Sequence, residues 1–239
     1  MTNDANGRRF AIYYAPVADS TLHRFGRACL GRDAITGAEW TPFAVDGVAA
    51  GRWREMTASP RRYGFHATLK PPFRLVEDRS PEQLIGALVA FASARRPLSA
   101  VPLRVACIAD FLALVPIDSS LELSTLAEAC VRDFDQFRAP PPAEERARRM
   151  NPSLSPRQRD LLDAWGYPYV LEEWRFHMTL ASGLFPHETE HLRQALEHLA
   201  EHGGATSLLV DGVCLFEQPD AGAPFLLTRR FPFTGRPHG

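Results

Sequence analysis

Two stretches of the sequence repeat one pattern, and this repeat constrains the fold more than any other feature. Residues 10–30 (FAIYYAPVADSTLHRFGRACL) and 111–131 (FLALVPIDSSLELSTLAEACV) each predict a strand, a proline, a polar helix cap and an amphipathic helix that has a cysteine near its end. After an irregular stretch, each copy continues into a short predicted strand, YGFHATL at 63–69 and RFHMTL at 175–180, and the two strands share the pattern FHxTL. We interpret this order as an internal duplication.

The duplication predicts an α+β fold with two pseudo-symmetric lobes, approximately 8–110 and 111–235, in a single bilobal domain that spans 1–239. Each lobe is expected to contain a small antiparallel sheet flanked by helices, with a central groove between the lobes. The stretch 31–62 is expected to be a long loop with room for one short helical turn. Further helices are predicted at 80–96 and 187–202, and further strands at about 101–108, 206–216 and 225–231.

The stretch 138–165 interrupts the repeat because it contains five prolines and six arginines. We expect an irregular helical excursion here. One interpretation is a plain surface excursion, and the other is a lid that shapes the substrate end of the groove. In the second case Arg148, Arg149 and Arg157 are candidates for contact with a second phosphate.

Composition limits the possible partners. The chain has 27 Lys and Arg against 28 Asp and Glu, so its net charge of -1 does not favour binding to long nucleic acid, while a small anionic ligand remains compatible. The four cysteines form no CxxC pair, which argues against a zinc knuckle or a redox dithiol. There is no apolar signal core at the N-terminus and no apolar run of about 18 residues, so we expect a cytoplasmic protein without a membrane partner.

The paired motifs place reactive side chains on one face of each predicted strand. Residues two apart in a strand point to the same face, so His66 projects with Thr68, and His177 with Thr179. The same alternation adds two cations, Lys70 to the first face and Arg175 to the second. Tyr63 falls on the opposite face of a regular strand and is a weaker candidate for ring or base contact. All seven residues are candidate site residues: His66 and His177 as catalytic groups, the other five as substrate contacts.

Two imidazoles that titrate near neutral pH can serve as a general base and a general acid. Hydroxyl groups with Lys70 and Arg175 can hold the non-bridging oxygens of a phosphoryl group. This chemistry needs neither a metal ion nor a cofactor. The expected partner is therefore a small phosphorylated substrate.

Paired HxT motifs in two α/β lobes resemble the two-histidine phosphoesterase superfamily, and the string RRYGFHATLKPPF with RFHMTL is similar to a branch often encoded with phosphonate-utilisation genes. The resemblance implies catalytic roles for His66 and His177, and phosphate-holding roles for Thr68 and Thr179. It implies metal-independent hydrolysis of a cyclic phosphodiester of a phosphorylated ribose. The alternatives are RNA 2′,3′-cyclic phosphate end processing or 2′,5′ ligation, and a non-catalytic nucleotide-binding module. Ala181 departs from the branch, where a small hydroxyl residue is expected.

One further motif has a competing interpretation. HETEH at 187–191 satisfies HExxH, the pattern in which two histidines one helical turn apart bind zinc. Pro186 places His187 in the first turn of the predicted helix, and the apolar stripe of that helix leaves these residues off the core face. A solvated helix start is therefore the favoured interpretation.

Overall fold

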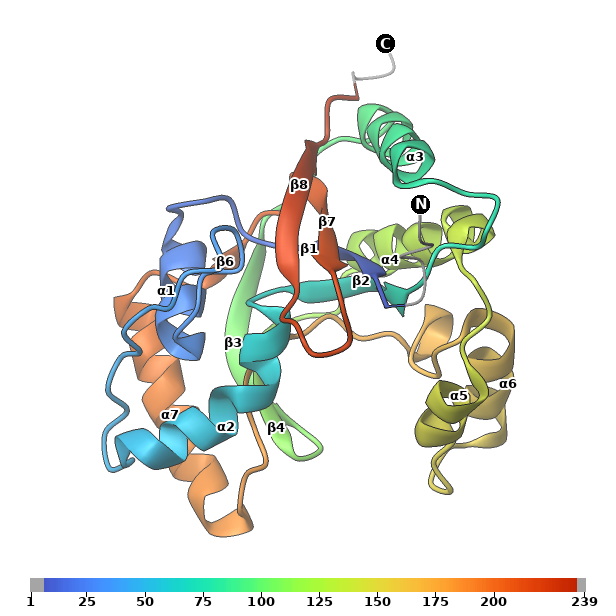
Figure 1. Ribbon diagram of the computed structural model, residues 1–239. Helices are drawn as coiled ribbons and strands as arrows, with labels where there is room; N and C mark the ends of the chain where they lie inside the picture. The colour runs from blue at the N-terminus through green and yellow to red at the C-terminus, as the bar shows by residue number, and fades with distance from the viewer. Residues whose placement is uncertain (1–6, 236–239) are drawn as a thin grey trace.

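In a computed structural model, which describes residues 7–235, the strands form one eight-stranded sheet in the order β6-β3-β4-β5-β2-β1-β7-β8 (Figure 1). Every pairing between neighbouring strands is antiparallel. The strands are β1 (Arg9–Tyr14), β2 (Ala67–Phe73), β3 (Val101–Ile108), β4 (Phe111–Pro116), β5 (Met178–Ser182), β6 (Ser207–Leu208), β7 (Gly212–Gln218) and β8 (Leu226–Pro232).

Seven α-helices and two short 3-10 turns accompany the sheet in the described part of the chain, so the predicted α+β class is confirmed. Across residues 7–235, none of the helices combines the length and the apolar character that crossing a bilayer requires. The helices are α1 (Thr21–Leu30), α2 (Ala50–Tyr63), α3 (Pro81–Ser93), α4 (Leu121–Asp133), α5 (Ala143–Arg149), α6 (Pro156–Trp165) and α7 (Pro186–His202), and the turns are η2 (Asp135–Phe137) and η3 (Leu171–Glu173).

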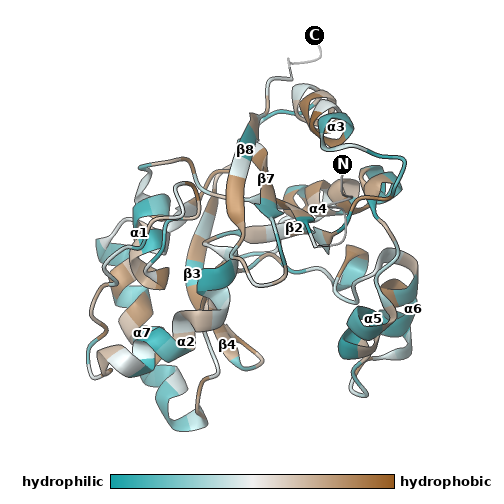
Figure 2. Ribbon diagram, in the orientation of Figure 1, coloured by the Kyte–Doolittle hydropathy of each residue, from teal (hydrophilic) through white to brown (hydrophobic). Residues whose placement is uncertain are grey.

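The two faces of the sheet have different environments, as the alternation along β1 shows. Phe10, Ile12 and Tyr14 point into the main apolar core, which also holds buried residues of α1, α2, α3, α4 and α7. Ala11 and Tyr13 point to the opposite face, where they join a smaller cluster that includes Phe216 and Phe225. We call this second side the open face. Figure 2 shows the mixed hydropathy of the sheet strands and the hydrophilic outer surfaces of α5 and α6.

The strand order is compatible with the predicted duplication, although the sheet is continuous rather than split into two. β1 and β2 are neighbours in the sheet, as β4 and β5 are, and the two pairs lie side by side because β2 pairs with β5. The third strand of each predicted copy pairs with the first strand of the other copy: β3 with β4, and β7 with β1. Strands from residues 8–110 and from residues 111–235 are therefore interleaved in one sheet. The lobe boundaries themselves stay a prediction.

One expected loop is a helix. Much of the stretch 31–62 forms α2, which buries Trp53, Met56 and Pro60. The sequence lacks the usual signals, because Ala49 at the N-cap offers no side-chain hydrogen bond and Pro60 lies inside the helix. α2 continues to Tyr63, so the strand expected at 63–69 begins only at Ala67.

Candidate functional site

The two HxT motifs meet on the open face at the centre of the sheet. β2 pairs with β5 through Ala67 and Met178, which point into the core. In this antiparallel register His66 lies opposite Thr179, and Thr68 lies opposite His177. All four side chains are half-buried. The structure therefore brings together two imidazoles and two hydroxyls that are separated by more than one hundred residues in the chain.

Both imidazoles are held in the same way. Nδ1 of His66 donates to the carbonyl oxygen of Gly64 at 2.8 Å, and Nδ1 of His177 donates to that of Arg175 at 2.9 Å. Because a carbonyl can only accept, Nδ1 carries the proton in each neutral ring, and Nε2 has a free lone pair. Nε2 of His66 lies 3.2 Å from the hydroxyl oxygen of Thr68. Nε2 of His66 therefore accepts a hydrogen bond from the Thr68 hydroxyl, whereas Nε2 of His177 makes no hydrogen bond with the residues that the structure describes.

The surroundings keep both rings neutral. Burial lowers the pKa of His66 to about 4; the hydrogen bond to Gly64 opposes this shift, and the charge of His177 adds to it. Burial also lowers the pKa of His177, against the hydrogen bond to Arg175. The electrostatic influence of His177 on His66 shows that the two rings share one environment. At neutral pH the site offers two proton acceptors.

Aromatic side chains form a wall beside His66. Tyr13 stacks on the imidazole with 3.8 Å between ring centroids and 21° between planes. Tyr63 and Phe216 lie 6.3 Å and 6.1 Å from the same ring. Sequence reasoning missed Tyr13, although its alternation with Phe10, Ile12 and Tyr14 places it on the open face. Tyr63 was expected on the other side, but it ends α2 and packs on the open face through Phe225, 5.3 Å away.

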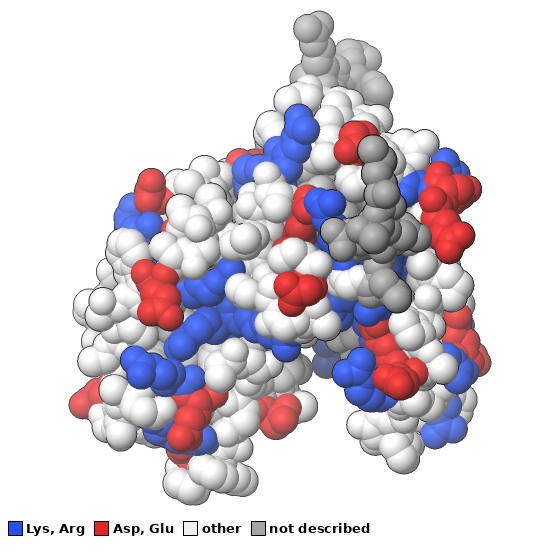
Figure 3. All heavy atoms as spheres, in the orientation of Figure 1, with Lys and Arg blue, Asp and Glu red and all other residues white. Residues whose placement is uncertain are grey.

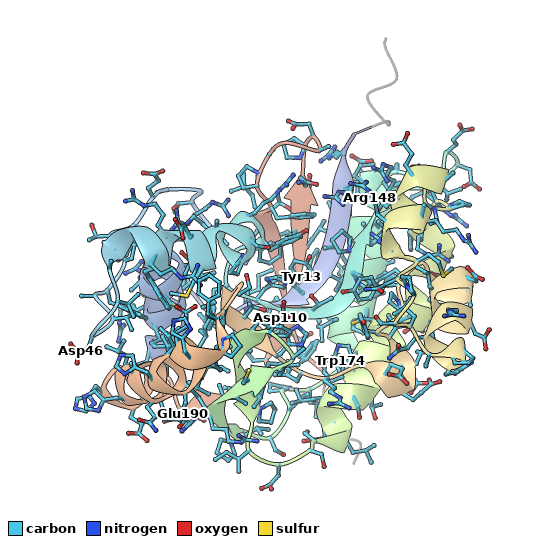
Figure 4. All side chains as sticks on the ribbon, turned by 90° about the horizontal axis from the view of Figure 1, so that it is seen from below. Tyr13, Asp46, Asp110, Arg148, Trp174 and Glu190 are labelled. Carbon is cyan, nitrogen blue, oxygen red and sulfur yellow. The ribbon has the colours of Figure 1, made fainter. Side chains whose placement is uncertain are left out.

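The molecule is notched on the side from which Tyr13 is seen. Figure 3 shows a notch in the lower edge of the molecule, and Figure 4 looks into the molecule from that side. Tyr13 lies in the middle of the view, between α2 on one side and α5 and α6 on the other. The stretch 138–165 contains these two helices, so it forms one wall of the notch. Whether it closes as a lid stays a prediction.

Lys70 is not part of this group, contrary to the expected alternation. Tyr13 pairs with Thr68 and Ile12 pairs with Lys70, so an extra residue, Leu69, forms a β-bulge. The bulge turns Lys70 to the helical side, where Nζ donates to the carbonyl of Val131 at 3.0 Å and to Asp135 at 3.1 Å. The side chain is 2% exposed. It therefore cannot reach a ligand on the open face.

The second motif has a bulge at the corresponding place. Leu112 pairs with Ala181 and Ala113 pairs with Thr179, so Leu180 is the extra residue. Ala181 consequently points into the core instead of joining His177. Two bulges at equivalent positions are compatible with the duplication.

Arg175 contributes through its backbone. Its carbonyl holds His177, while the side chain is exposed and makes no hydrogen bond or ion pair with the residues that the structure describes. The other neighbour of His177 is Phe111, with ring centroids 5.4 Å apart. Arg175 is free to reach a ligand, but the structure does not hold it in place.

HETEH at 187–191 has other contacts. Glu188 forms an ion pair with Arg52 and accepts from the backbone NH of Phe185. Nε2 of His191 lies 2.8 Å from the carbonyl oxygen of Asp46. Within residues 7–235, no group of three or more His, Cys, Asp and Glu side chains is arranged to hold a metal ion. These contacts join the start of α7 to α2 and the loop before it.

A family described as "Protein of unknown function (DUF1045)" matches residues 68–226, more than half of the sequence. The chain belongs to the DUF1045 family. Its match covers both HxT threonines and the second histidine. Membership of the two-histidine phosphoesterase superfamily stays a prediction.

Two curated relatives of this DUF1045 protein are named ribose 1,5-bisphosphate phosphokinase PhnN. The relative from Janthinobacterium sp. (strain Marseille) is 38% identical over 235 residues, which is 95% of this chain and 51% of the relative. The relative from Laribacter hongkongensis (strain HLHK9) is 35% identical over 222 residues, 92% of this chain and 51% of the relative. The chain thus spans about half the length of these relatives. Their names fit the predicted link to phosphonate metabolism.

Solved structures show weaker similarity. TT0787 of Thermus thermophilus aligns with a TM-score of 0.47 at 12% identity, covering 96% of this chain and 100% of that chain. ATU0111 from Agrobacterium tumefaciens str. C58, a conserved protein of unknown function, aligns with a TM-score of 0.43 at 13% identity. This alignment covers 94% of this chain and 86% of that chain.

These relatives correct the function expected from the sequence. A phosphokinase is a transferase, so the names contradict both the predicted cyclic phosphodiester hydrolysis and the hydrolase class. The RNA end-processing, ligation and nucleotide-binding alternatives gain no better support. The prediction failed because histidines on one face specify proton transfer at a phosphoryl group, but not the reaction in which it takes place.

Proposed function

We propose that the open face binds a phosphorylated ribose of the ribose 1,5-bisphosphate class and holds it for phosphoryl transfer. The observation that carries this proposal is the convergence of two Nε2 proton acceptors and two threonine hydroxyls on one face. The relatives' name supplies the ligand class. The cytoplasmic location and the lack of a nucleic-acid partner remain predictions.

The site's atoms have distinct roles in this proposal. Ligand binding replaces the hydrogen bond from Thr68 to Nε2 of His66. The hydroxyls of Thr68 and Thr179 then donate to phosphate oxygens, and the neutral imidazoles of His66 and His177 accept a proton from a sugar hydroxyl or a protonated phosphate. A bound phosphate dianion favours the charged imidazole, so ligand binding is expected to take up a proton. Tyr13 packs against His66 and fixes the plane of its ring.

The proposal covers the ribose phosphate and assigns no site to the phosphoryl donor. Kinases of one large class cradle nucleotide phosphates in a glycine-rich loop that ends in Gly-Lys-Ser/Thr. Lys70, the one lysine of the 239 residues, follows Leu69, so the sequence contains no such loop. The kinase activity of the longer relatives is therefore not assigned to this chain.

Isothermal titration calorimetry with ribose 1,5-bisphosphate tests the proposal. His66→Gln and His177→Gln are each expected to raise the Kd at least about tenfold, because each removes a direct contact with a charged group. His198→Gln is the matched control, since His198 lies on α7 outside the open face. Titrations in buffers of different ionisation enthalpy measure the proton uptake. Equal Kd values for all three variants and the original protein would contradict the proposal.

A further inference from the structure

Three arginines surround one buried carboxylate at the edge of the open face. Arg74 and Arg149 each place a terminal nitrogen 2.6 Å from a different oxygen of Glu145, and Arg9 lies 4.0 Å away. The Glu145 side chain is 9% exposed, and the three arginine side chains are between 17% and 22% exposed. One negative charge therefore faces three positive charges, so the net charge of these four side chains is +2.

The fold brings these residues together from three elements. Phe10 pairs with Phe73, so Arg9 at the start of β1 and Arg74 just after β2 are neighbours across the two strands. Glu145 and Arg149 come from α5, one helical turn apart. α5 thus lies against the sheet through Glu145. We call Arg9, Arg74 and Arg149 the arginine cluster.

Aromatic rings connect the arginine cluster with the imidazoles. The guanidinium of Arg9 lies 5.5 Å from the ring centroid of Phe225. Phe225 in turn lies 6.3 Å from Tyr13, which stacks on His66. On the α5 side, Arg149 lies 5.7 Å from the ring of Tyr167. Buried aromatic rings on the same side of the sheet therefore link the cluster to the paired motifs.

The cluster also has open space beside it. A surface hollow, open to solvent, is lined by Arg74, Arg149 and Glu145 together with Arg138 and Gly166. Arg138 is engaged by Asp135 at 2.7 Å, so it adds little free charge. Arg74 and Arg149 are the cations that this hollow exposes to a ligand.

Glu145 remains charged in this setting. Burial raises its pKa, but the hydrogen bond from Arg74 and the charges of Arg149, Arg74 and Arg9 outweigh burial, so the pKa is lowered overall. The carboxylate holds the guanidinium groups of Arg74 and Arg149 close together despite their mutual repulsion. Glu145 is accordingly a positioning residue.

We infer that the arginine cluster binds a second phosphate group of the ligand, at the end of the open face away from the paired histidines. Guanidinium groups present paired N–H donors that match phosphate oxygens, and an excess of two positive charges matches a phosphate dianion. The inference rests on the proposed function, because it specifies that the open face takes a bisphosphorylated rather than a monophosphorylated sugar.

The test compares two arginines of the same helix. Arg149→Gln removes a cluster guanidinium, whereas Arg146→Gln removes the same charge from an exposed pair with Asp163. We expect Arg149→Gln to raise the Kd for ribose 1,5-bisphosphate about tenfold, and Arg146→Gln to change it less than about twofold. Thermal unfolding of both variants checks that α5 still folds. Equal Kd values for the two variants would overturn the inference.

A second variant predicts an effect of opposite sign. Glu145→Gln keeps the size of the side chain and one oxygen that accepts from an arginine, but it removes the charge that competes with the phosphate for the guanidinium groups. We therefore expect this variant to tighten binding several-fold, which a merely structural role for Glu145 would not produce. Weaker or unchanged binding by a folded Glu145→Gln variant would count against the inference; if that variant does not fold, the comparison of Arg149→Gln with Arg146→Gln decides.

The two proposals fail in distinguishable ways. If the histidine site is wrong and the cluster is right, Arg149→Gln weakens binding and His66→Gln does not. If the cluster is wrong and the histidine site is right, His66→Gln weakens binding while Arg149→Gln matches Arg146→Gln.

Discussion

Two carbonyl oxygens, those of Gly64 and Arg175, determine what the histidines can do. Each holds Nδ1 of the imidazole two residues later, so both rings present Nε2 to the open face. The same local geometry occurs in both HxT motifs, and it depends on the backbone that enters the strand rather than on the motif itself. At this scale, the residues before each histidine matter as much as the threonines after it.

The lowered pKa of His66 predicts a pH-dependent stability. The ordinary pKa of histidine is about 6.5, and that of His66 in the folded chain is about 4. Between these two pH values the imidazole is protonated in the unfolded chain and neutral in the folded chain. The free energy of unfolding should therefore fall as the pH falls through this window. In His66→Gln the decline should be smaller, with His177 contributing the part that remains. Urea unfolding near pH 7.5 and pH 4.5 measures both slopes; identical slopes in the two proteins would refute the assignment.

The lowered pKa of Lys70 predicts that stability also rises with pH in the alkaline range. Burial lowers its pKa from 10.5 to about 8, although Asp135 opposes the shift. Above about pH 8 the folded chain releases a proton that the unfolded chain keeps until about 10.5, so stability should rise with pH through this window. Lys70→Met should lose this rise, as urea unfolding at about pH 7.5 and 9.5 would show.

Ligand affinity provides the complementary measurement for Lys70. The side chain faces α4 and η2, so Lys70→Met should leave the Kd for ribose 1,5-bisphosphate unchanged. A clear loss of affinity in a normally folded variant would show that the Lys70 side chain reaches the ligand, which would contradict its placement on the helical side of the sheet.

Sequence reasoning was most reliable for the residues within each motif. Strict alternation correctly places His66 with Thr68, because nothing disturbs the strand between them. It fails for Lys70 because a bulge adds one residue, and for Tyr63 because a helix occupies the expected strand. Neither bulge has a glycine or another local signal, since Leu69 and Leu180 are ordinary strand residues.

At the scale of elements, Gly64 is the joint between α2 and β2. Its φ of 79° and ψ of 172° belong to a region that is open mainly to glycine, and an added Cβ would collide with the side chain of Ala34. We expect Gly64→Ala to lower the free energy of unfolding by about 2–4 kcal/mol. It should also weaken ligand binding, because the carbonyl that holds His66 would move.

Gly86 provides a matched control for Gly64. It lies inside α3, where an added Cβ meets nothing within 4 Å. Gly86→Ala should therefore raise the free energy of unfolding by about 0.5–1 kcal/mol, since alanine favours the helix. Urea unfolding of both variants measures the difference, and a destabilisation of equal size in the two would show that Gly64 has no special role.

The helices differ in how clearly local sequence signals predict them. α3 has Ser80 and Gln83 in a capping box and a proline in its first turn, and it was predicted within a few residues. α2 has no side-chain cap and is stabilised by burying Trp53 and Met56 against distant elements. Tertiary packing of this kind leaves no local pattern in the sequence.

At the scale of the whole molecule, strand order was beyond prediction because it depends on contacts between distant segments. β1 pairs with β2 and with β7, and β7 begins about two hundred residues later. The repeat predicted related halves, but not that β3 and β7 would each pair with the opposite copy. The pairing of β2 with β5 at the centre of the sheet places the two histidines on the same face of it.

The attachment of α5 and α6 to this sheet is the weakest large contact that bears on the site. Leu161 of α6 packs in a small cluster with Val131 and Val170, separate from the main core. α5 reaches the sheet through the ion pairs of Glu145 with Arg74 and Arg9. Segments held by few apolar contacts open at a lower free energy than core strands. α5 should therefore exchange its amide hydrogens faster than β1 and β2.

Ligand binding should slow the exchange of the amide hydrogens of α5. A phosphate held by Arg74 and Arg149 would tie α5 to the sheet, so saturating ribose 1,5-bisphosphate should slow hydrogen exchange in 143–149 more than in α3, which lies outside the open face. The slowing should persist in Arg146→Gln and disappear in Arg149→Gln, as hydrogen exchange read by mass spectrometry would show. If protection of 143–149 were the same in both variants, the ligand would be stabilising α5 without the arginine cluster, and the two ends of the open face would have to be assigned to separate functions.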